Sequence, residues 1–139
     1  ATDPARVAAC GTSRGGFMAL HVAAADSRIR AVAAFAPVTN LMALREFDGA
    51  KNTAHVATLS LLANADKFAG RSVWMVISDR DDRVSTDDSI AFARRATVVS
   101  LEKSEAADVT FLVLPEPKGH TTPKGAPELA AAWIADRLE

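Results

Sequence analysis

A serine flanked by glycines lies near the start of the chain, where an apolar segment gives way to a helical one. The segment GTSRG at residues 11–15 matches the pattern Gly-x-Ser-x-Gly. The pattern alone is common, but a strand is predicted directly before it and a helix directly after it, as in a nucleophile elbow. Such a sharp turn would raise the Ser13 hydroxyl above the sheet edge, at the positive end of the helix. Ser13 is therefore predicted to be a nucleophile for acyl transfer.

The residues around Ser13 are predicted to serve the same turn. Gly11 and Gly15 are expected where a side chain would collide with the neighbouring strand or helix, and Gly16 is expected to let the helix pack closely against the sheet. The backbone amide of Arg14 is predicted to be one donor of an oxyanion hole. The alternative interpretation is an ordinary glycine-rich turn between a strand and a helix, for instance one that binds phosphate.

A serine hydroxyl needs a neighbouring base, and the chain has three histidines, His21, His55 and His120. His120 lies in the loop PEPKGHTTP, residues 115–123, after the last predicted strand, and active groups collect at that edge of a parallel sheet. His21 lies well inside the first helix and is expected to point away from Ser13, whereas His55 opens a central helical segment. We therefore predict that His120 is the base and that the other two are structural or surface residues.

The elements that would position these residues alternate between strand and helix, which is typical of a parallel sheet covered by helices. Apolar runs such as VWMVI, residues 73–77, indicate strands that are buried on both faces. We predict an α/β fold, a three-layer sandwich with a mostly parallel sheet of about four strands, formed by residues 1–139 as a single domain. The expected strands are Arg6–Cys10, Arg30–Ala36, Ser72–Ser78 and Val109–Leu114, and the expected helices are Arg14–Ala25, Leu41–Phe47, Ala54–Ala65, Thr86–Leu101 and Ala126–Leu138.

Two details of the helices are also predicted. The first helix, Arg14–Ala25, is apolar on most sides, which predicts deep burial. The helix from Thr86 is expected to be capped by Ser85 or Thr86, ahead of the acidic pair Asp87 and Asp88.

Composition restricts the class of protein. The 139 residues are 49% hydrophobic and 24% charged, with a formal net charge of -1, so nothing favours nucleic acid or a membrane surface as a partner. No apolar stretch approaches the roughly 18 residues of a spanning helix, and no leader peptide is recognisable. The single cysteine, Cys10, excludes an internal disulfide and an all-cysteine metal site, and it agrees with a cytoplasmic location.

The acid that would orient the histidine is expected in the loop SDRDDRV, residues 78–84, after the third predicted strand. The loop contains Asp79, Asp81 and Asp82, and position after the strand leaves all three open. The loop resembles the Gly-x-x-Asp-x-x-Val acid loop of α/β hydrolases, with Ser78 in place of the glycine. The resemblance implies that Asp81 is the acid.

Over most of its length the chain resembles the catalytic domain of the prolyl oligopeptidase and dienelactone hydrolase group within the α/β hydrolases. The similar stretches are GTSRGG, FAPVTN, DRDDRV and the GH of the histidine loop. The resemblance implies hydrolysis of an ester or amide through an acyl-enzyme, without a metal or organic cofactor. Ser13 would attack the carbonyl, His120 would take its proton, and Asp81 would hold the imidazolium.

The resemblance covers only the C-terminal half of that fold. A complete α/β hydrolase has about eight strands and its elbow follows the fifth, whereas here the elbow follows the first. The second oxyanion donor comes from a loop of the other half and has no candidate in this chain. The strand at Val7–Cys10 would also form an exposed apolar edge, and we expect a second copy of the chain, in a homo-oligomer, or a complementing N-terminal fragment to cover it.

Substrate selection is harder to assign. Residues 41–68 occupy the position of a cap or substrate-binding excursion, and Leu41, Met42, Leu44 and Phe47 are candidates for an acyl pocket, with packing in the core as the alternative. The leading functional interpretation is a carboxylesterase-like hydrolase of small esters. A peptidase of the prolyl oligopeptidase kind is the alternative enzyme. A non-catalytic half-domain that serves in assembly, or one product of a proteolysed longer enzyme, are the remaining interpretations.

Overall fold

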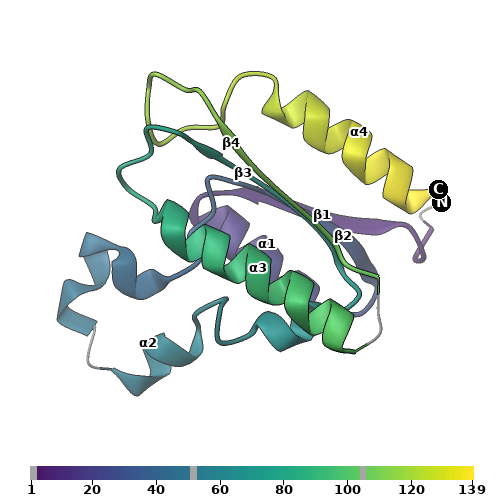
Figure 1. Cartoon of the computed structure of the whole chain (residues 1–139), viewed down its shortest axis with the longest axis horizontal. Helices are drawn as coiled ribbons and strands as arrows, with labels where there is room; N and C mark the ends of the chain where they lie inside the picture. The colour runs from purple at the N-terminus through teal and green to yellow at the C-terminus, as the bar shows by residue number, and fades with distance from the viewer. Residues whose placement is uncertain (1–2, 51–52, 104–105) are drawn as a thin grey trace.

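Four parallel strands form a single sheet whose spatial order is their order in the chain. The computed structural model describes residues 3–50, 53–103 and 106–139. The strands are β1 (Val7–Thr12), β2 (Ile29–Phe35), β3 (Ser72–Ser78) and β4 (Asp108–Leu114). Because each strand pairs in parallel with the next, the carboxyl ends of all four lie at one edge of the sheet (Figure 1).

Helices cover both faces of this sheet. Helices α1 (Arg14–Ala25) and α3 (Thr86–Glu102) lie on one face, and α4 (Ala126–Leu138) lies on the other (Figure 1). Two separate hydrophobic clusters fill the two interfaces between helices and sheet. The predicted three-layer α/β sandwich with a parallel sheet is therefore confirmed.

Strand β3 shows why a continuous apolar run forms a central strand. Its side chains alternate between the two faces, so Val73, Met75 and Ile77 belong to the cluster beneath α1 and α3. Trp74 and Val76 belong to the cluster beneath α4. Their exposed fractions are 2% or less, and burial of each such side chain contributes roughly 1.5–3 kcal/mol.

The helices that flank the site begin as local sequence predicts. The Oγ of Ser85 accepts a hydrogen bond from the amide of Asp88 at 3.0 Å, which caps α3, and the acidic first turn matches the positive end of the helix. Helix α4 starts after Gly125, which has a left-handed φ of 80°, and it carries a proline in its first turn. The observed bounds of α1 and α4 are the predicted ones.

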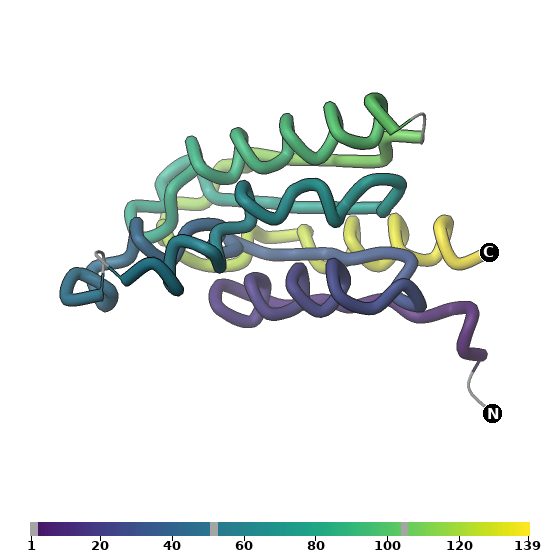
Figure 2. The backbone as a smooth tube through the Cα atoms, turned by 90° about the horizontal axis from the view of Figure 1, so that it is seen from below, coloured from purple at the N-terminus to yellow at the C-terminus, as the bar shows by residue number. Residues whose placement is uncertain are grey.

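The segment 41–68, between β2 and β3, differs from the prediction of two helices. It consists of the short 3-10 helices η1 (Leu41–Ala43), η2 (Arg45–Ala50) and η3 (Ala65–Phe68) around the one-turn helix α2 (Ala54–Thr58). The Oδ1 of Asn40 accepts a hydrogen bond from the amide of Met42 at 3.0 Å and caps the start of η1, but Leu44 has an extended backbone, with φ -86° and ψ 136°, and ends the helix after one turn. Helices this short gain little stability from their own hydrogen bonds, so they depend on contacts with the rest of the protein. Figure 2 shows the segment extending beyond the carboxyl edge of the strands.

Helix α1 is less buried than predicted. Met18 is 57% exposed and Val22 is 45% exposed. The physical reason is position: α1 lies beside β1, which is at the edge of the sheet, and no other described element covers the outer side of this pair. The expected strand edge at Val7–Cys10 is thus free in the described part of the chain, and its covering partner stays a prediction.

The remaining differences concern the ends of elements. Strand β1 continues to Thr12, past the predicted end at Cys10, β2 is shifted back by one residue from Arg30–Ala36, and β4 begins at Asp108. Within the described ranges, no helix is both long and apolar enough to cross a membrane.

Candidate active site

Ser13 occupies a strained turn between β1 and α1. Its φ of 55° and ψ of -118° lie in a region that non-glycine residues rarely adopt, at a cost of about 1–3 kcal/mol. Backbone hydrogen bonds hold this conformation. The amide of Ser13 donates to the carbonyl of Phe35 at 2.8 Å, and its own carbonyl accepts from the amides of Phe17 and Val38 at 3.1 and 3.2 Å. The turn is thus fastened to the end of β2 and to the helix it opens.

The glycines around this turn do not all behave as predicted. A Cβ on Gly11 would lie 2.2 Å from the carbonyl oxygen of Gly15, so the predicted collision is present there. A Cβ on Gly16 would lie 3.1 Å from the Cβ of Pro37, which agrees with close packing of the helix. The expectation for Gly15 is wrong, because a Cβ there would meet no described atom within 4 Å apart from its chain neighbours and the backbone of its own helix. Gly15 contributes its backbone to the tight contact, whereas its own Cβ direction is open.

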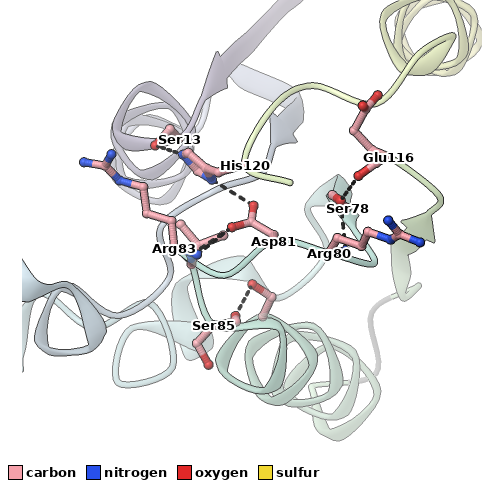
Figure 3. Close-up of polar contacts among 10 residues, drawn as sticks. Ser13, Ser78, Arg80, Asp81, Arg83, Ser85, Glu116 and His120 are labelled. Atoms are coloured by element: carbon pink, nitrogen blue, oxygen red, sulfur yellow. Dashed lines mark hydrogen bonds and ion pairs between the residues drawn. The ribbon is translucent and has the colours of Figure 1, made fainter. Parts of the chain in front are cut away.

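Three side chains from three loops form a continuous hydrogen-bonded chain. The Oγ of Ser13 lies 2.9 Å from the Nε2 of His120, and the Nδ1 of His120 lies 2.8 Å from the Oδ2 of Asp81. Figure 3 shows the imidazole between the serine and the carboxylate. Because a carboxylate only accepts, the Nδ1 of His120 donates to it, and the Nε2 is left to accept the proton of the Ser13 hydroxyl.

Asp81 is the only one of the three aspartates in residues 78–84 that contacts His120 among the described residues. Its side chain is 0% exposed, and its Oδ1 accepts from the amides of Arg83 and Val84 at 3.0 and 3.1 Å. Asp79 instead accepts from the amide of Glu116 at 3.1 Å, which links the acid loop to the histidine loop. Both carboxylate oxygens of Asp81 are thus satisfied, which fixes its orientation toward the imidazole.

Two further contacts that were not predicted tie the acid loop to the histidine loop. The Oγ of Ser78 donates to the carbonyl of Glu116 at 3.1 Å and accepts from the amide of Arg80 at 3.0 Å (Figure 3). Gly119 has a φ of +76°, and a Cβ there would lie 3.1 Å from the Arg80 carbonyl oxygen. The departure at Ser78 from the glycine of the acid-loop pattern was the one available signal for these contacts.

The other two histidines lie away from this chain of hydrogen bonds. The Nε2 of His21 donates to the carbonyl of Leu59 at 3.0 Å, and its ring contacts the ring of Phe17 at a centroid distance of 4.4 Å. Burial lowers the pKa of His21, and the hydrogen bond to Leu59 opposes this effect. His55 is exposed at the start of α2. Their placement matches the structural and surface positions predicted for them.

The start of α1 presents hydrogen-bond donors near Ser13. Arg14 is the first residue of the helix, so its amide has no intrahelical acceptor and is free to donate to an oxyanion. The predicted donor is therefore at a suitable position. For metal ions, the described residues contain no group of three or more His, Cys, Asp or Glu side chains that could hold one.

The residues predicted for an acyl pocket lie in or against the core instead. Leu41 and Leu44 are buried members of the larger hydrophobic cluster, and Met42 and Phe47 pack against it. The structure thus favours the core-packing alternative for Leu41 and Leu44, whereas Met42 and Phe47 are only partly buried and their role in a pocket stays a prediction. The reason is that Leu41 and Leu44 join the larger hydrophobic cluster, where burial of their side chains is favourable.

The cavities beside the site are lined mainly by charged residues. One open cavity of about 370 Å³ is lined by Ala43, Arg45, Glu46, Asp82 and Arg83. A second, of about 390 Å³, is lined by Ala43, by residues 81–84 of the acid loop and by residues 85–87 at the start of α3. Both therefore adjoin the loop that carries Asp81.

Comparison with known proteins finds a family that the chain matches. The model of the prolyl oligopeptidase family, a peptidase family, matches residues 1–138. A comparison with curated proteins gave no match. Similar solved structures include a puromycin-hydrolysing peptidase of Mycobacterium tuberculosis, with 19% identity and a TM-score of 0.71 over 99% of this chain and 23% of that one.

Two further structures extend the comparison. A glucuronoyl esterase of Solibacter usitatus has 14% identity and a TM-score of 0.75, over 99% of this chain and 44% of that one. An acylaminoacyl peptidase of Pyrococcus horikoshii has 15% identity and a TM-score of 0.73, over 99% of this chain and 25% of that one. The present chain thus spans less than half of each of these proteins, whose shared architecture is the α/β-hydrolase fold.

The match to a peptidase family, together with this fold, supports a hydrolase of the serine kind. Because the family model covers nearly the whole chain, the chain belongs to the prolyl oligopeptidase family.

Proposed function

We propose that this chain carries the catalytic triad of a serine hydrolase that cleaves carboxylic esters through an acyl-enzyme. The observation that carries the proposal is the hydrogen-bonded series from Ser13 through His120 to Asp81, at the strained turn that opens α1. A serine, a base within hydrogen-bond reach and a third group that orients the base are the parts that nucleophilic catalysis requires.

In the first half of the reaction, the Nε2 of His120 takes the proton of the Ser13 hydroxyl while the Oγ attacks the carbonyl carbon. The negative charge moves to the carbonyl oxygen, where the amide of Arg14 donates to it. The tetrahedral species collapses, and the leaving alkoxide takes the proton from His120. Asp81 keeps the Nδ1 proton in place and stabilises the imidazolium. Ser13 now carries the acyl group.

In the second half, water replaces the alcohol. His120 takes a proton from the water, which attacks the acyl carbon of Ser13. When this tetrahedral species collapses, the Oγ of Ser13 leaves and recovers its proton from His120, and the carboxylic acid departs. Ser13, His120 and Asp81 are then as they were at the start, and the net reaction consumes one water and the ester and releases an alcohol and a carboxylic acid.

A peptidase is the second candidate, and the family match favours it. Two chemical differences separate the reactions. An amide has a poorer leaving group, and its tetrahedral species needs stronger oxyanion stabilisation, where loss of one donor costs roughly 10²–10³ in rate. Only the Arg14 amide has been identified as a donor, so we place ester hydrolysis first.

Hydrolysis of 4-nitrophenyl esters and of a proline-containing arylamide, measured side by side, tests both candidates. Ester turnover that Ser13→Ala and His120→Ala each reduce to near background supports the proposal. Faster turnover of the arylamide would favour the peptidase instead. Ester turnover that survives both substitutions would contradict the triad assignment.

We further propose that the free edge of β1 is covered in the active assembly, by a second copy of the chain or by a separate polypeptide that adds strands. Partly buried apolar residues on β1 and the exposed Met18 and Val22 of α1 support this. Light scattering is the direct check, and a strictly monomeric, soluble and active chain would contradict it.

A further inference from the structure

The cavity of about 370 Å³ beside the acid loop is lined by two guanidinium groups, those of Arg45 and Arg83, and two carboxylates, those of Glu46 and Asp82. It adjoins the triad through Arg83, whose amide donates to the Oδ1 of Asp81 at 3.0 Å. In Figure 3 the Arg83 side chain extends away from the acid loop on the side of the site where Ser13 is drawn. A substrate bound at Ser13 would therefore have charged groups close to its reacting carbonyl.

Glu46 lines this cavity and links two segments of the chain. It belongs to η2, in the excursion between β2 and β3, and its Oε1 forms an ion pair with the guanidinium of Arg83 on the acid loop. Both side chains remain about half exposed, at 42% and 52%, so the pair faces the open cavity rather than the core. The ion pair bridges segments that are far apart in the sequence, and it directs the Arg83 side chain.

The charge of Glu46 also acts on the residue after the nucleophile. The pKa of Glu46 is held below its usual range, first by its own backbone amide, then by the Arg83 guanidinium, and more weakly by the charge of Arg14. The carboxylate of Glu46 thus interacts with the cation of Arg83 on the acid loop and, more weakly, with that of Arg14 in the first turn of α1. Within the described residues, Arg45 forms no ion pair, so the carboxylate of Glu46 limits how positive the cavity becomes.

We propose that Glu46 is a specificity-determining residue that keeps this cavity electrically balanced, so that the site favours substrates whose group near the scissile carbonyl is uncharged. The proposal rests on the function proposed above and names a property of the same site. With Glu46 neutralised, the two arginines that line the cavity, Arg45 and Arg83, would be opposed by one lining carboxylate, that of Asp82. Substrates that carry a carboxylate would then bind and react relatively better.

The test compares Glu46→Gln with the unaltered chain on two esters that differ in one charge, 4-nitrophenyl hydrogen adipate and 4-nitrophenyl heptanoate. Glutamine keeps the size of the side chain and removes its charge. We expect the ratio of kcat/KM for the adipate to that for the heptanoate to rise about tenfold, the effect of two unit charges about 6 Å apart at an effective dielectric constant of about 40, between the values for a protein surface and for water. The matched control is Glu102→Gln, which removes an exposed, ion-paired carboxylate from α3, away from the cavity.

A second measurement separates this proposal from the triad assignment. The 4-nitroanilides of adipic acid and heptanoic acid are titrated into the Ser13→Ala chain, with and without Glu46→Gln, and binding is followed by NMR shifts. The same rise of about tenfold in relative affinity supports the proposal even if Ser13 proves not to be the nucleophile. An unchanged ratio, an equal change in the Glu102→Gln control, or the absence of saturable binding would overturn it.

Discussion

Substitution of the two elbow glycines by alanine should have opposite effects. In Gly11→Ala, the new Cβ would lie 2.2 Å from the carbonyl oxygen of Gly15, 2.4 Å from its carbonyl carbon and 2.8 Å from the amide nitrogen of Gly16. All three atoms are backbone, so no flexible side chain can move aside. Relief requires a shift of about 1 Å between β1 and the first turn of α1, the part of the chain that carries Ser13.

The magnitude follows from these contacts. Overpacking in a core costs roughly 1–3 kcal/mol when side chains can adjust, so we expect Gly11→Ala to lower the free energy of unfolding by about 3 kcal/mol or more. That is a large share of the roughly 5–15 kcal/mol of a small domain. Gly15→Ala places its Cβ where no described atom lies within 4 Å apart from its chain neighbours and the backbone of its own helix. We expect it to be neutral or to stabilise the protein by up to about 1 kcal/mol, because alanine is the better helix former.

Urea denaturation followed by far-UV circular dichroism measures both changes, with the midpoint and the slope fitted together. The pair of variants controls for the general effect of adding a methyl group near the turn. A Gly11→Ala chain within 1 kcal/mol of the unaltered one would refute the reasoning. So would a Gly15→Ala chain that is destabilised as much as Gly11→Ala.

The remaining predictions concern the acid and one histidine. Asp81→Asn should reduce kcat by about 10³–10⁴-fold with little change in KM, because the amide group would leave His120 in the wrong tautomer. The control Asp79→Asn should keep kcat within about tenfold of the unaltered chain. Similar losses of kcat in both variants would show that the acid is misassigned. The pKa of His21 is lowered from its usual value of 6.5, so the unfolded chain takes up protons first as the pH falls. The contribution of neutral His21 to the free energy of unfolding is therefore present above about pH 6.5 and is lost as the pH falls below it. The urea midpoint should decrease when the pH is lowered from 7.5 to about 5.5. In His21→Gln, whose side chain can still donate to the carbonyl of Leu59, the urea midpoint should decrease less over the same pH range. An equal decrease would show that another group titrates.

The sheet and its flanking helices were predictable because their signals are local. Strand β3 is a continuous apolar run in a chain that alternates strand and helix, and such a run is informative without any tertiary contact. The serine cap of α3 and the first-turn proline of α4 marked the starts of those helices. The positions of Ser13 and His120 also followed from sequence, since Ser13 comes directly after β1 and His120 lies in the loop after β4, and the carboxyl ends of these strands share one edge.

The features that were missed depend on contacts between distant residues. The apolar residues of segment 41–68 had the composition of helices, and neither the extended backbone of Leu44, which ends η1, nor the burial of Leu41 and Leu44 in the core can be read from composition. The open direction of Gly15 depends on the path of β1 beside α1. The ion pair between Glu46 and Arg83 joins two surface loops, and no local pattern indicates which charged residues will meet.

The most direct test of the central assignment is the intact mass of the purified chain after exposure to a fluorophosphonate. The reagent labels a serine only when a neighbouring base activates it. We predict a single adduct, which Ser13→Ala and His120→Ala each remove and Glu102→Gln leaves unchanged. An adduct that survives Ser13→Ala, or no adduct on the unaltered chain, would contradict the account of an assembled triad.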